Sequence, residues 1–204
     1  MIRNIVLDLG GVLITYQPVI SIMKAGYSRE EAERLNHSVF LDPLWAKLDQ
    51  GTYASMQEAL PFFLEAHPED ASLIRSFFSS DWMELLFQPI EASVVFLKKL
   101  KQKGYKVYFL TNYAADTYQE TSARLPFFSL ADGAVVSSEV KVNKPDERIY
   151  RILLDRYGLV PGETLFFDDH GINCEAAIRC GMHAEVFRDA EHAEKDLKAL
   201  AGMP

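Results

Sequence analysis

The fold is decided by the first fourteen residues, MIRNIVLDLGGVLI (Met1–Ile14), in which an apolar stretch is interrupted by Asp8 and a pair of glycines. We interpret Ile2–Asp8 as a buried strand, because a short apolar run bounded by turn residues is typical of a strand covered on both faces. The stretch resembles a signal peptide only superficially. Asp8 breaks it and no small-residue cleavage pattern follows.

Four further β-rich runs are bounded by turn or helix signals: Lys106–Thr111, Gly133–Ser137, Thr164–Asp168 and His183–Phe187. Between these runs, apolar periodicity predicts helices that end at or near a glycine: Glu91–Lys103 before Gly104, Asp146–Tyr157 before Gly158, and Gly171–Cys180 before Gly181. Strands that alternate with helices imply right-handed crossovers. The sequence therefore predicts an α/β fold with a doubly wound parallel sheet.

The region from Thr15 to Gln88 breaks this alternation, because it contains no clear strand and is punctuated by prolines. Its pieces are amphipathic and helix-like, and Ser28–Glu31 fits a capping box. A small aromatic core is expected from Trp45, Phe62, Phe63, Phe77, Phe78 and Trp82. We therefore predict an all-helical domain over residues 15–88, inserted into a core domain made of residues 1–14 and 89–204.

Composition narrows the class of protein. The chain has 204 residues, 49% of them hydrophobic and 25% charged, which suits one core of ordinary size with a small insertion. A net charge of -8 argues against a nucleic-acid partner, which would require a basic patch. The longest apolar runs are about half of the ~20 residues needed to span a membrane. Cys174 and Cys180 are not expected to form a disulfide, so we predict a reducing, cytoplasmic location.

Reactive residues follow four of the predicted strands. Asp8 ends the first, Thr111 and Asn112 end the second, the loop after the third contains Lys144, and Asp168 and Asp169 end the fourth. In an open parallel sheet the carboxyl ends of the strands form the ligand-binding edge, so these residues should converge. Taken singly, an Asp at a strand end is usually a cap, a Thr-Asn pair a turn and a Lys-Pro a solvated loop. Two adjacent aspartates repel each other, and a bound cation is the simplest remedy.

These residue types suit phosphoryl transfer through a covalent aspartate. A carboxylate nucleophile such as Asp8 divides hydrolysis into two steps. A divalent cation held by a carboxylate pair removes the repulsion between nucleophile and phosphate. A lysine and a hydroxyl, here Lys144 and Thr111, stabilise the remaining phosphate oxygens.

The motifs IVLDLGGVLI, YFLTN, KVNKPDERIY and LFFDDHGINCEAAIRCGM resemble, in order and spacing, those of the haloacid dehalogenase (HAD) superfamily. The resemblance covers essentially the whole chain and implies a Rossmann-like core with a small helical cap after the first motif. It implies that Asp8 is the nucleophile, that Thr111 binds the phosphoryl group with Asn112 beside it, and that Lys144 neutralises both nucleophile and phosphate.

The resemblance also implies a Mg²⁺ site. Asp8, Asp169 and the backbone carbonyl of Gly10 would be ligands, and Asp168 would bind directly or through water. Asn173 matches an asparagine that often follows the acidic pair and orders its loop.

Gly10 departs from the family pattern, because most phosphatases of the superfamily carry a second Asp there as general acid and base. Such help is typically worth ~10²–10⁴-fold. The DLGxV form of the first motif resembles a subgroup that acts on sugar phosphates, so Gly10 does not imply inactivity. His170 is a candidate replacement because histidine titrates near neutrality, although a loop histidine facing solvent is the more ordinary interpretation. Weaker candidates near the motif ends are Tyr16, Tyr113 and Asp116, and candidate specificity contacts in the insertion are Asp49 and Gln50.

Three hypotheses follow. The first is a Mg²⁺-dependent phosphatase for a small phosphorylated metabolite such as a sugar phosphate. The second is a metal-independent haloacid dehalogenase, which tolerates Gly10 but is opposed by the Asp168–Asp169 pair. The third is a binding or regulatory protein that kept the fold and lost turnover. The sequence names neither the substrate nor the oligomeric state.

Overall fold

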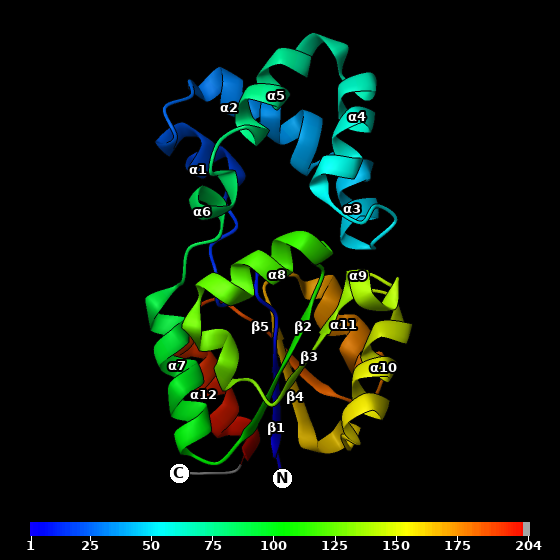
Figure 1. Cartoon of the computed structure of the whole chain (residues 1–204). Helices are drawn as coiled ribbons and strands as arrows, with labels where there is room; N and C mark the ends of the chain where they lie inside the picture. The colour runs from blue at the N-terminus through cyan, green and yellow to red at the C-terminus, as the bar shows by residue number, and fades with distance from the viewer. Residues whose placement is uncertain (202–204) are drawn as a thin grey trace.

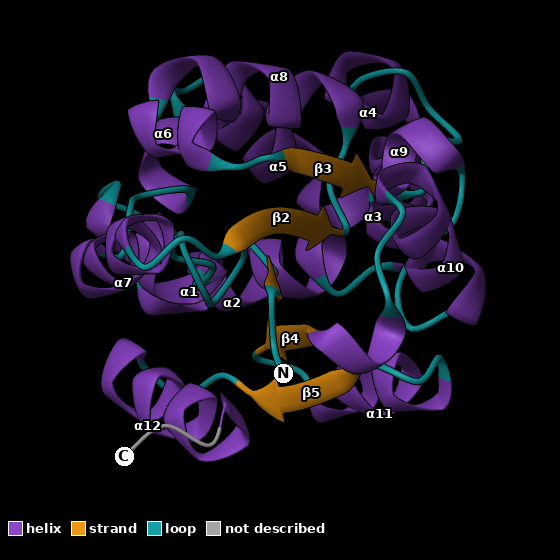
Figure 2. Ribbon diagram, turned by 90° about the horizontal axis from the view of Figure 1, so that it is seen from below, coloured by secondary structure: helices purple, strands orange, loops and turns teal. Residues whose placement is uncertain are grey.

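The computed structural model describes residues 1–201 and contains a five-stranded parallel sheet. Its strands are β1 (Asn4–Leu7), β2 (Lys106–Thr111), β3 (Gly133–Val136), β4 (Thr164–Asp168) and β5 (His183–Val186). Their order in the sheet is β3-β2-β1-β4-β5, and every neighbouring pair is parallel. The chain adds β2 and β3 on one side of β1 and then crosses to add β4 and β5 on the other (Figure 2). The predicted doubly wound α/β sheet is confirmed.

The boundaries of three strands differ from the prediction. The first strand starts at Asn4 and not at Ile2, and it ends one residue before Asp8. Asp8 still donates its N–H to the Phe167 carbonyl, but its own carboxylate accepts the next N–H, that of Leu9, which turns the chain away from the sheet. The third and fifth strands each end one residue earlier than predicted.

Helices cover both faces of the sheet (Figure 2). On one side are α7 (Glu91–Gln102) and α12 (Ala190–Ala201), and on the other are α10 (Glu147–Tyr157) and α11 (Gly171–Arg179). Alternate residues of β1 serve two separate cores, because successive side chains of a strand point to opposite faces. Ile5 and Leu7 share a cluster with Leu97 of α7, and Val6 shares the other with Leu153 of α10. Burial on both faces explains why these strands are so apolar.

The helix ends follow the predicted signals. Asp146 lies outside α10 as its N-cap and accepts the N–H of Arg148. Gly104, Gly158 and Gly181 each end a helix with a φ of 83°, 60° and 83°. The remaining short elements of the core are α8 (Ala115–Arg124), η3 (Pro126–Leu130), α9 (Ser137–Val140) and η4 (Pro161–Glu163).

Between β1 and α7 the regular elements of the described chain are all helices, apart from isolated bridges at Gly10, Ile14 and Pro89. The elements are α1 (Pro18–Lys24), α2 (Arg29–Leu35), η1 (Asn36–Phe40), α3 (Pro43–Asp49), α4 (Met56–Ala66), η2 (Pro68–Asp70), α5 (Ala71–Phe78) and α6 (Trp82–Leu86). We call residues 15–88 the helical insertion. Most of it lies beyond the carboxyl ends of the strands (Figure 1). Its all-helical character is confirmed, and its status as a separate domain stays a prediction.

The aromatic core of the insertion is largely as predicted. Phe63 and Phe77 are fully buried, and Trp45 and Trp82 are nearly so. Phe62 was wrongly included, since it lies on the exposed side of α4 against Tyr53. The capping box is confirmed, with Ser28 and Glu31 bonding each other's backbone N–H.

Two further observations concern membrane-spanning helices and disulfide bonds. Among the described residues, no helix combines the length and the apolar character needed to cross a membrane. Cys174, which is buried, and Cys180 are both free thiols.

Candidate active site

The carboxyl ends of β1, β2 and β4 lie side by side, at the point where the winding of the sheet reverses. Above them is a cavity of about 370 Å³ between the sheet and the helical insertion. Most of the site residues predicted from the sequence line this cavity. Asp168, which is fully buried, and the weaker candidates Asp116 and Gln50 do not. A larger hollow of about 680 Å³ lies at the opposite edge of the sheet, near Asn4 and Lys106, and holds none of the predicted residues.

A buried lysine joins two carboxylates at the base of the cavity. The Nζ atom of Lys144, whose side chain is 2% exposed, lies 2.9 Å from Oδ1 of Asp8 and 2.6 Å from Oδ2 of Asp168. Burial alone would lower the pKa of the Lys144 ammonium, but the charges of Asp8 and Asp168 raise it above its ordinary value. The lysine therefore stays charged and neutralises one of its two partners.

The two carboxylate oxygens of Asp8 have different surroundings. Oδ1 accepts the backbone N–H of Leu9 at 2.7 Å and also faces Lys144. No hydrogen bond or ion pair to Oδ2 occurs among the residues that the structure describes. Burial raises the pKa of Asp8 to about 6, although Lys144 lowers it, so the carboxylate is still mostly ionised at neutral pH. One oxygen is thus held in place and the other is free to react.

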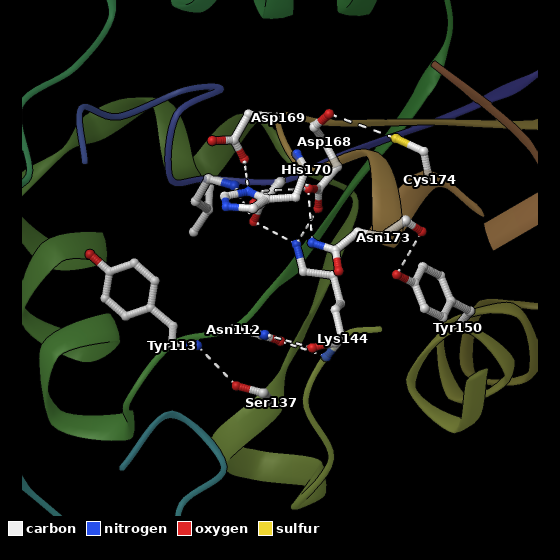
Figure 3. A network of polar contacts seen from close by, with 12 residues as sticks. Asn112, Tyr113, Ser137, Lys144, Tyr150, Asp168, Asp169, His170, Asn173 and Cys174 are labelled. Carbon is white, nitrogen blue, oxygen red and sulfur yellow. Dashed lines mark hydrogen bonds and ion pairs between the residues drawn. The ribbon is translucent and has the colours of Figure 1, made fainter. Parts of the chain in front are cut away.

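Asp168 and Asp169 do not form the mutually repelling pair that the sequence suggested. Asp168 points inward, where Oδ2 meets Lys144 and Oδ1 accepts the N–H of His170 and the Nδ2 of Asn173, each at 2.9 Å (Figure 3). Asp169 is partly exposed and lies 2.8 Å from Nδ1 of His170. Successive side chains at a strand end point in different directions, so the two carboxylates do not face each other. Lys144 also neutralises Asp168.

Oxygen donors suited to a divalent cation remain around Asp169. They are the free Oδ2 of Asp8, the carboxylate of Asp169 and the carbonyl of Gly10, which accepts no hydrogen bond from the described residues. The loop after Asp8 approaches Asp169 closely, because a Cβ on Gly11, whose φ is 70°, would lie 2.3 Å from Oδ2 of Asp169. Hard oxygen ligands of this kind fit Mg²⁺. Both oxygens of Asp168 already have partners, so its part in metal binding stays a prediction.

Thr111, Asn112 and Asn173 hold different positions around the cavity. The Thr111 hydroxyl has no hydrogen-bond partner within the described chain, which leaves it available to a ligand. Asn112 bonds the backbone of Lys144 twice, through Nδ2 at 3.0 Å and Oδ1 at 2.8 Å. Its side chain therefore positions Lys144, and direct phosphate binding by Asn112 stays a prediction. Asn173 makes the contact with Asp168 that is expected of a residue ordering this loop.

His170 is poorly placed as a buried acid. Its side chain is 67% exposed, and its Nδ1 is engaged with Asp169. Asp168, Asp169 and His170 can bring one ligand atom each within 4.8 Å of one another. His170 therefore borders the cavity and also contacts Asp169, one of the candidate metal donors.

Sequence reasoning missed Ser137, although it follows the third strand at the same edge. Its hydroxyl accepts the N–H of Tyr113 at 2.9 Å and lies 2.5 Å from the backbone carbonyl of Asp49. The rule that found Asp8 and Thr111 could have found it. Phe87, which lines the cavity from the end of the insertion, carried no comparable signal.

The helical insertion is attached to the core through its main chain. Three core side chains donate to backbone carbonyls at the carboxyl end of α3: Asn143 to Ala46 at 2.7 Å, Ser137 to Asp49 at 2.5 Å and Lys141 to Gly51 at 2.5 Å. The last carbonyls of a helix lack partners within the helix and carry partial negative charge, so donors and a cation stabilise them. This docking fixes the position of Asp49 over the cavity.

Asp49 is expected to destabilise the folded protein at neutral and higher pH. Burial raises its pKa from 3.8 to about 7, although a backbone hydrogen bond from Ala114 lowers it. The folded protein then holds this proton more tightly than the unfolded chain does. The contribution of this bound proton to stability is full below pH 4 and is lost as the pH rises through 7.

We therefore expect Asp49→Asn to raise the free energy of unfolding at pH 8 by about 1–3 kcal/mol, since one pKa unit corresponds to about 1.4 kcal/mol. At pH 4.5 the variant and the wild type should differ much less. Urea unfolding at both pH values, in EDTA, measures this difference. Asp81→Asn, at an exposed aspartate, is the matched control. Equal effects of Asp49→Asn at the two pH values would contradict the expectation.

Comparisons with known proteins find relatives that match most of the chain. A family model described as haloacid dehalogenase-like hydrolase matches residues 2–181. The chain is 28% identical over 189 residues to (S)-2-haloacid dehalogenase 4A of Burkholderia cepacia, covering 89% of this chain and 81% of that protein. It is 32% identical over 154 residues to phosphoserine phosphatase of Thermus thermophilus, covering 68% of this chain and 59% of that protein.

Among solved structures, a HAD family enzyme of Bacteroides thetaiotaomicron superposes with a TM-score of 0.70 at 25% identity, over 92% of this chain and 94% of that one. The same enzyme in complex with magnesium and inorganic phosphate gives a TM-score of 0.71 at 23% identity, over 93% and 96% of the two chains.

Proposed function

The chain belongs to the haloacid dehalogenase-like hydrolases, and from this premise we propose that it is a Mg²⁺-dependent phosphatase of a small phosphorylated metabolite. The proposal is carried by the free Oδ2 of Asp8, which shares a cavity with the carboxylate of Asp169 and the ammonium of Lys144. Lys144 balances only one of the three carboxylates Asp8, Asp168 and Asp169. The excess negative charge suits a divalent cation and does not suit an unaided anionic substrate.

The residues of the chain have distinct roles in the proposed reaction. Mg²⁺, held by Asp8, Asp169 and the Gly10 carbonyl, would neutralise phosphate oxygens and so reduce the repulsion between substrate and nucleophile. Lys144 and the Leu9 N–H hold Oδ1 of Asp8, which leaves Oδ2 to attack phosphorus. The ester bond to the leaving oxygen breaks, and an aspartyl-phosphate forms on Asp8. Water then attacks this intermediate, releasing phosphate and the original carboxylate.

The cavity limits the substrate. Its volume of about 370 Å³ is at the small end of ligand sites. Its walls combine the aromatic side chains of Tyr16, Trp45 and Phe87 with polar groups at the base, among them Asp8, Thr111 and Lys144. A small monoester with an apolar or sugar-like body fits this lining. The likeness to a phosphoserine phosphatase over 68% of the chain supports the same class of substrate.

A second candidate is 2-haloacid dehalogenation. It is favoured by the 28% identity to a haloacid dehalogenase over most of both chains, and by Gly10, since halide leaves without a proton. The partly exposed carboxylate of Asp169 opposes it, because an unneutralised carboxylate beside Asp8 would repel a haloacid.

One comparison of two substrates tests the proposal. We expect phosphate release from p-nitrophenyl phosphate with Mg²⁺, loss of that release in EDTA, and no halide release from 2-chloropropionate. Phosphate and chloride are measured on the same preparation, and restoration by Mg²⁺ after chelation controls for damage to the protein. Halide release without metal would establish the dehalogenase. Absence of both activities, also across a panel of phosphorylated metabolites, would favour a non-catalytic binding protein.

A further inference from the structure

The proposed phosphatase reaction requires two proton transfers for which Gly10 supplies no group. The oxygen of an alkyl leaving group needs a proton as its bond to phosphorus breaks. The water that attacks the aspartyl-phosphate must afterwards lose one. The assignment of both transfers to one residue of this chain rests on the proposed function.

Asp49 brings a carboxylate to the cavity from the insertion side. It is the last residue of α3, and it lines the same cavity as Asp8 and Lys144. Its backbone is fixed by Ser137, and the side chain of its neighbour Gln50 bonds the carbonyl of Lys141 at 3.1 Å. The residue is partly buried and borders the cavity. Asp49 therefore reaches the cavity from the helical insertion, whereas Asp8 reaches it from the end of the first strand.

Asp49 has no cationic partner among the described residues, in contrast to Asp70 and Asp132. Asp70 pairs with Arg34, and Asp132 pairs with Lys101 and Lys106. Those lysine contacts hold the pKa of Asp132 at about 2, whereas burial raises that of Asp49 to about 7. A carboxyl group of this kind exists in both protonation states near neutral pH, which a group that gives and then takes a proton requires.

The charged and titratable groups around Asp49 are consistent with this behaviour. The negative charge of Asp8 raises the pKa of Asp49, and the positive charge of Lys144 lowers it. Tyr16 and Tyr113 also face it, and burial together with the charge of Asp49 raises the pKa of both phenols above the ordinary value. Neither tyrosine can act as a base at neutral pH.

The other candidate acids and bases, Asp116 and His170, already have hydrogen-bond partners. Both oxygens of Asp116 accept backbone N–H groups, those of Thr117 and Met56, each at 2.8 Å. The imidazole of His170 is largely in solvent and is bound to Asp169. Among the residues considered, Asp49 alone combines a place in the cavity with a carboxylate that has no charged partner.

We propose that Asp49 of the helical insertion is the general acid and base of the reaction, in place of the side chain that Gly10 lacks. As Oδ2 of Asp8 bonds to phosphorus, the ester bond breaks and its electron pair stays on the leaving oxygen, which takes the proton of the Asp49 carboxyl group. The resulting Asp49 carboxylate then takes a proton from water as the water oxygen attacks the aspartyl-phosphate. The bond between phosphorus and Oδ2 breaks, which regenerates Asp8, protonated Asp49 and free inorganic phosphate.

The test compares Asp49→Asn with wild type on two probes, p-nitrophenyl phosphate and glycerol 3-phosphate, in Mg²⁺. On the alkyl ester we expect kcat to fall by about 10²–10⁴-fold. The aryl ester leaves without a proton, so its first step should survive while the second slows. We expect a rapid burst of about one p-nitrophenolate per active site, followed by slow turnover and accumulation of phosphorylated Asp8. Glu65→Gln, at an exposed glutamate of the same insertion, is the matched control and should behave as wild type.

A rescue variant distinguishes proton transfer from a purely structural role. An added Cβ on Gly10 would lie 3.6 Å from Cβ of Tyr16, which is ordinary contact, and Gly10 does not have a positive φ. In the Asp49→Asn background, Gly10→Asp places a carboxylate where the family usually has one. We expect it to recover at least about tenfold of the lost alkyl-ester activity, a fraction of what a general acid supplies.

The outcomes separate this inference from the proposed function. A wild-type protein without Mg²⁺-dependent phosphate release contradicts the function itself. If the wild type is active, Asp49→Asn activity within threefold on glycerol 3-phosphate overturns the role of Asp49. So does a folded, Mg²⁺-binding Asp49→Asn protein that shows no p-nitrophenolate burst, because the first step should not need its proton. Loss of activity that Gly10→Asp leaves unrestored assigns Asp49 a structural role instead.

Discussion

Asp8→Asn is expected to lower kcat for phosphate release by more than about 10⁴-fold, the scale on which loss of a catalytic nucleophile acts. The substitution removes the free attacking charge and changes little else. The Oδ1 of asparagine can still accept the Leu9 N–H, and Lys144 keeps its ion pair with Asp168. No buried charge is therefore left without a partner, and the protein should fold.

The measurement is steady-state phosphate release, with circular dichroism and thermal unfolding to confirm the fold. Asp81→Asn makes the same chemical change at an exposed aspartate and should leave kcat unchanged. Trapping a phosphoenzyme from wild type and not from Asp8→Asn would locate the intermediate. Activity of Asp8→Asn within tenfold of wild type would exclude the covalent mechanism.

Asp169→Ala is expected to weaken Mg²⁺ binding by at least about 100-fold, since loss of an outer partner of a metal site alone costs 10–100-fold. Asp169 is the carboxylate of the acidic pair that is not bound to Lys144, and it lies against the loop after Asp8. Activity at fixed Mg²⁺ should fall correspondingly and recover in part at high Mg²⁺ concentration.

Isothermal titration of Mg²⁺ into the chelated protein measures the affinity directly, without reference to turnover. The control is Asp155→Ala, at an exposed aspartate of α10. An Asp169→Ala protein with unchanged Mg²⁺ affinity would place the metal elsewhere. Normal activity of the wild type after chelation would instead favour the metal-independent dehalogenase.

The sequence predicted the sheet and its reactive edge because both follow from local rules. Apolar runs of strand length, ended by Asp8, Thr111 and Asp168, place these residues together once the strands are parallel. The rules did not distinguish Asp168 from Asp169. In the sequence the two residues appear as one acidic pair. In the fold, the side chain of Asp168 contacts Lys144, and that of Asp169 lies near Gly11 and His170.

Asp49 shows why the remainder of the site was harder to predict. Its place over the cavity depends on how the helical insertion folds back onto the core, which is a long-range event decided by packing and by donors such as Ser137 and Lys141. The sequence around Asp49 suggested only a substrate contact before a glycine. That its carboxylate has no cationic partner among the described residues could be recognised only in three dimensions.

The attachment of α3 through main-chain oxygens bears on how such an enzyme diversifies. Asn143, Ser137 and Lys141 bind backbone carbonyl groups, which every residue has. These hydrogen bonds therefore do not depend on the side chains of α3. Trp45, on the same helix, lines the cavity and makes none of these docking bonds through its side chain. Mutations there can alter substrate preference while these three hydrogen bonds stay in place. A change of specificity at the wall of the cavity therefore does not require a change in the attachment of α3 or in the catalytic residues of the core.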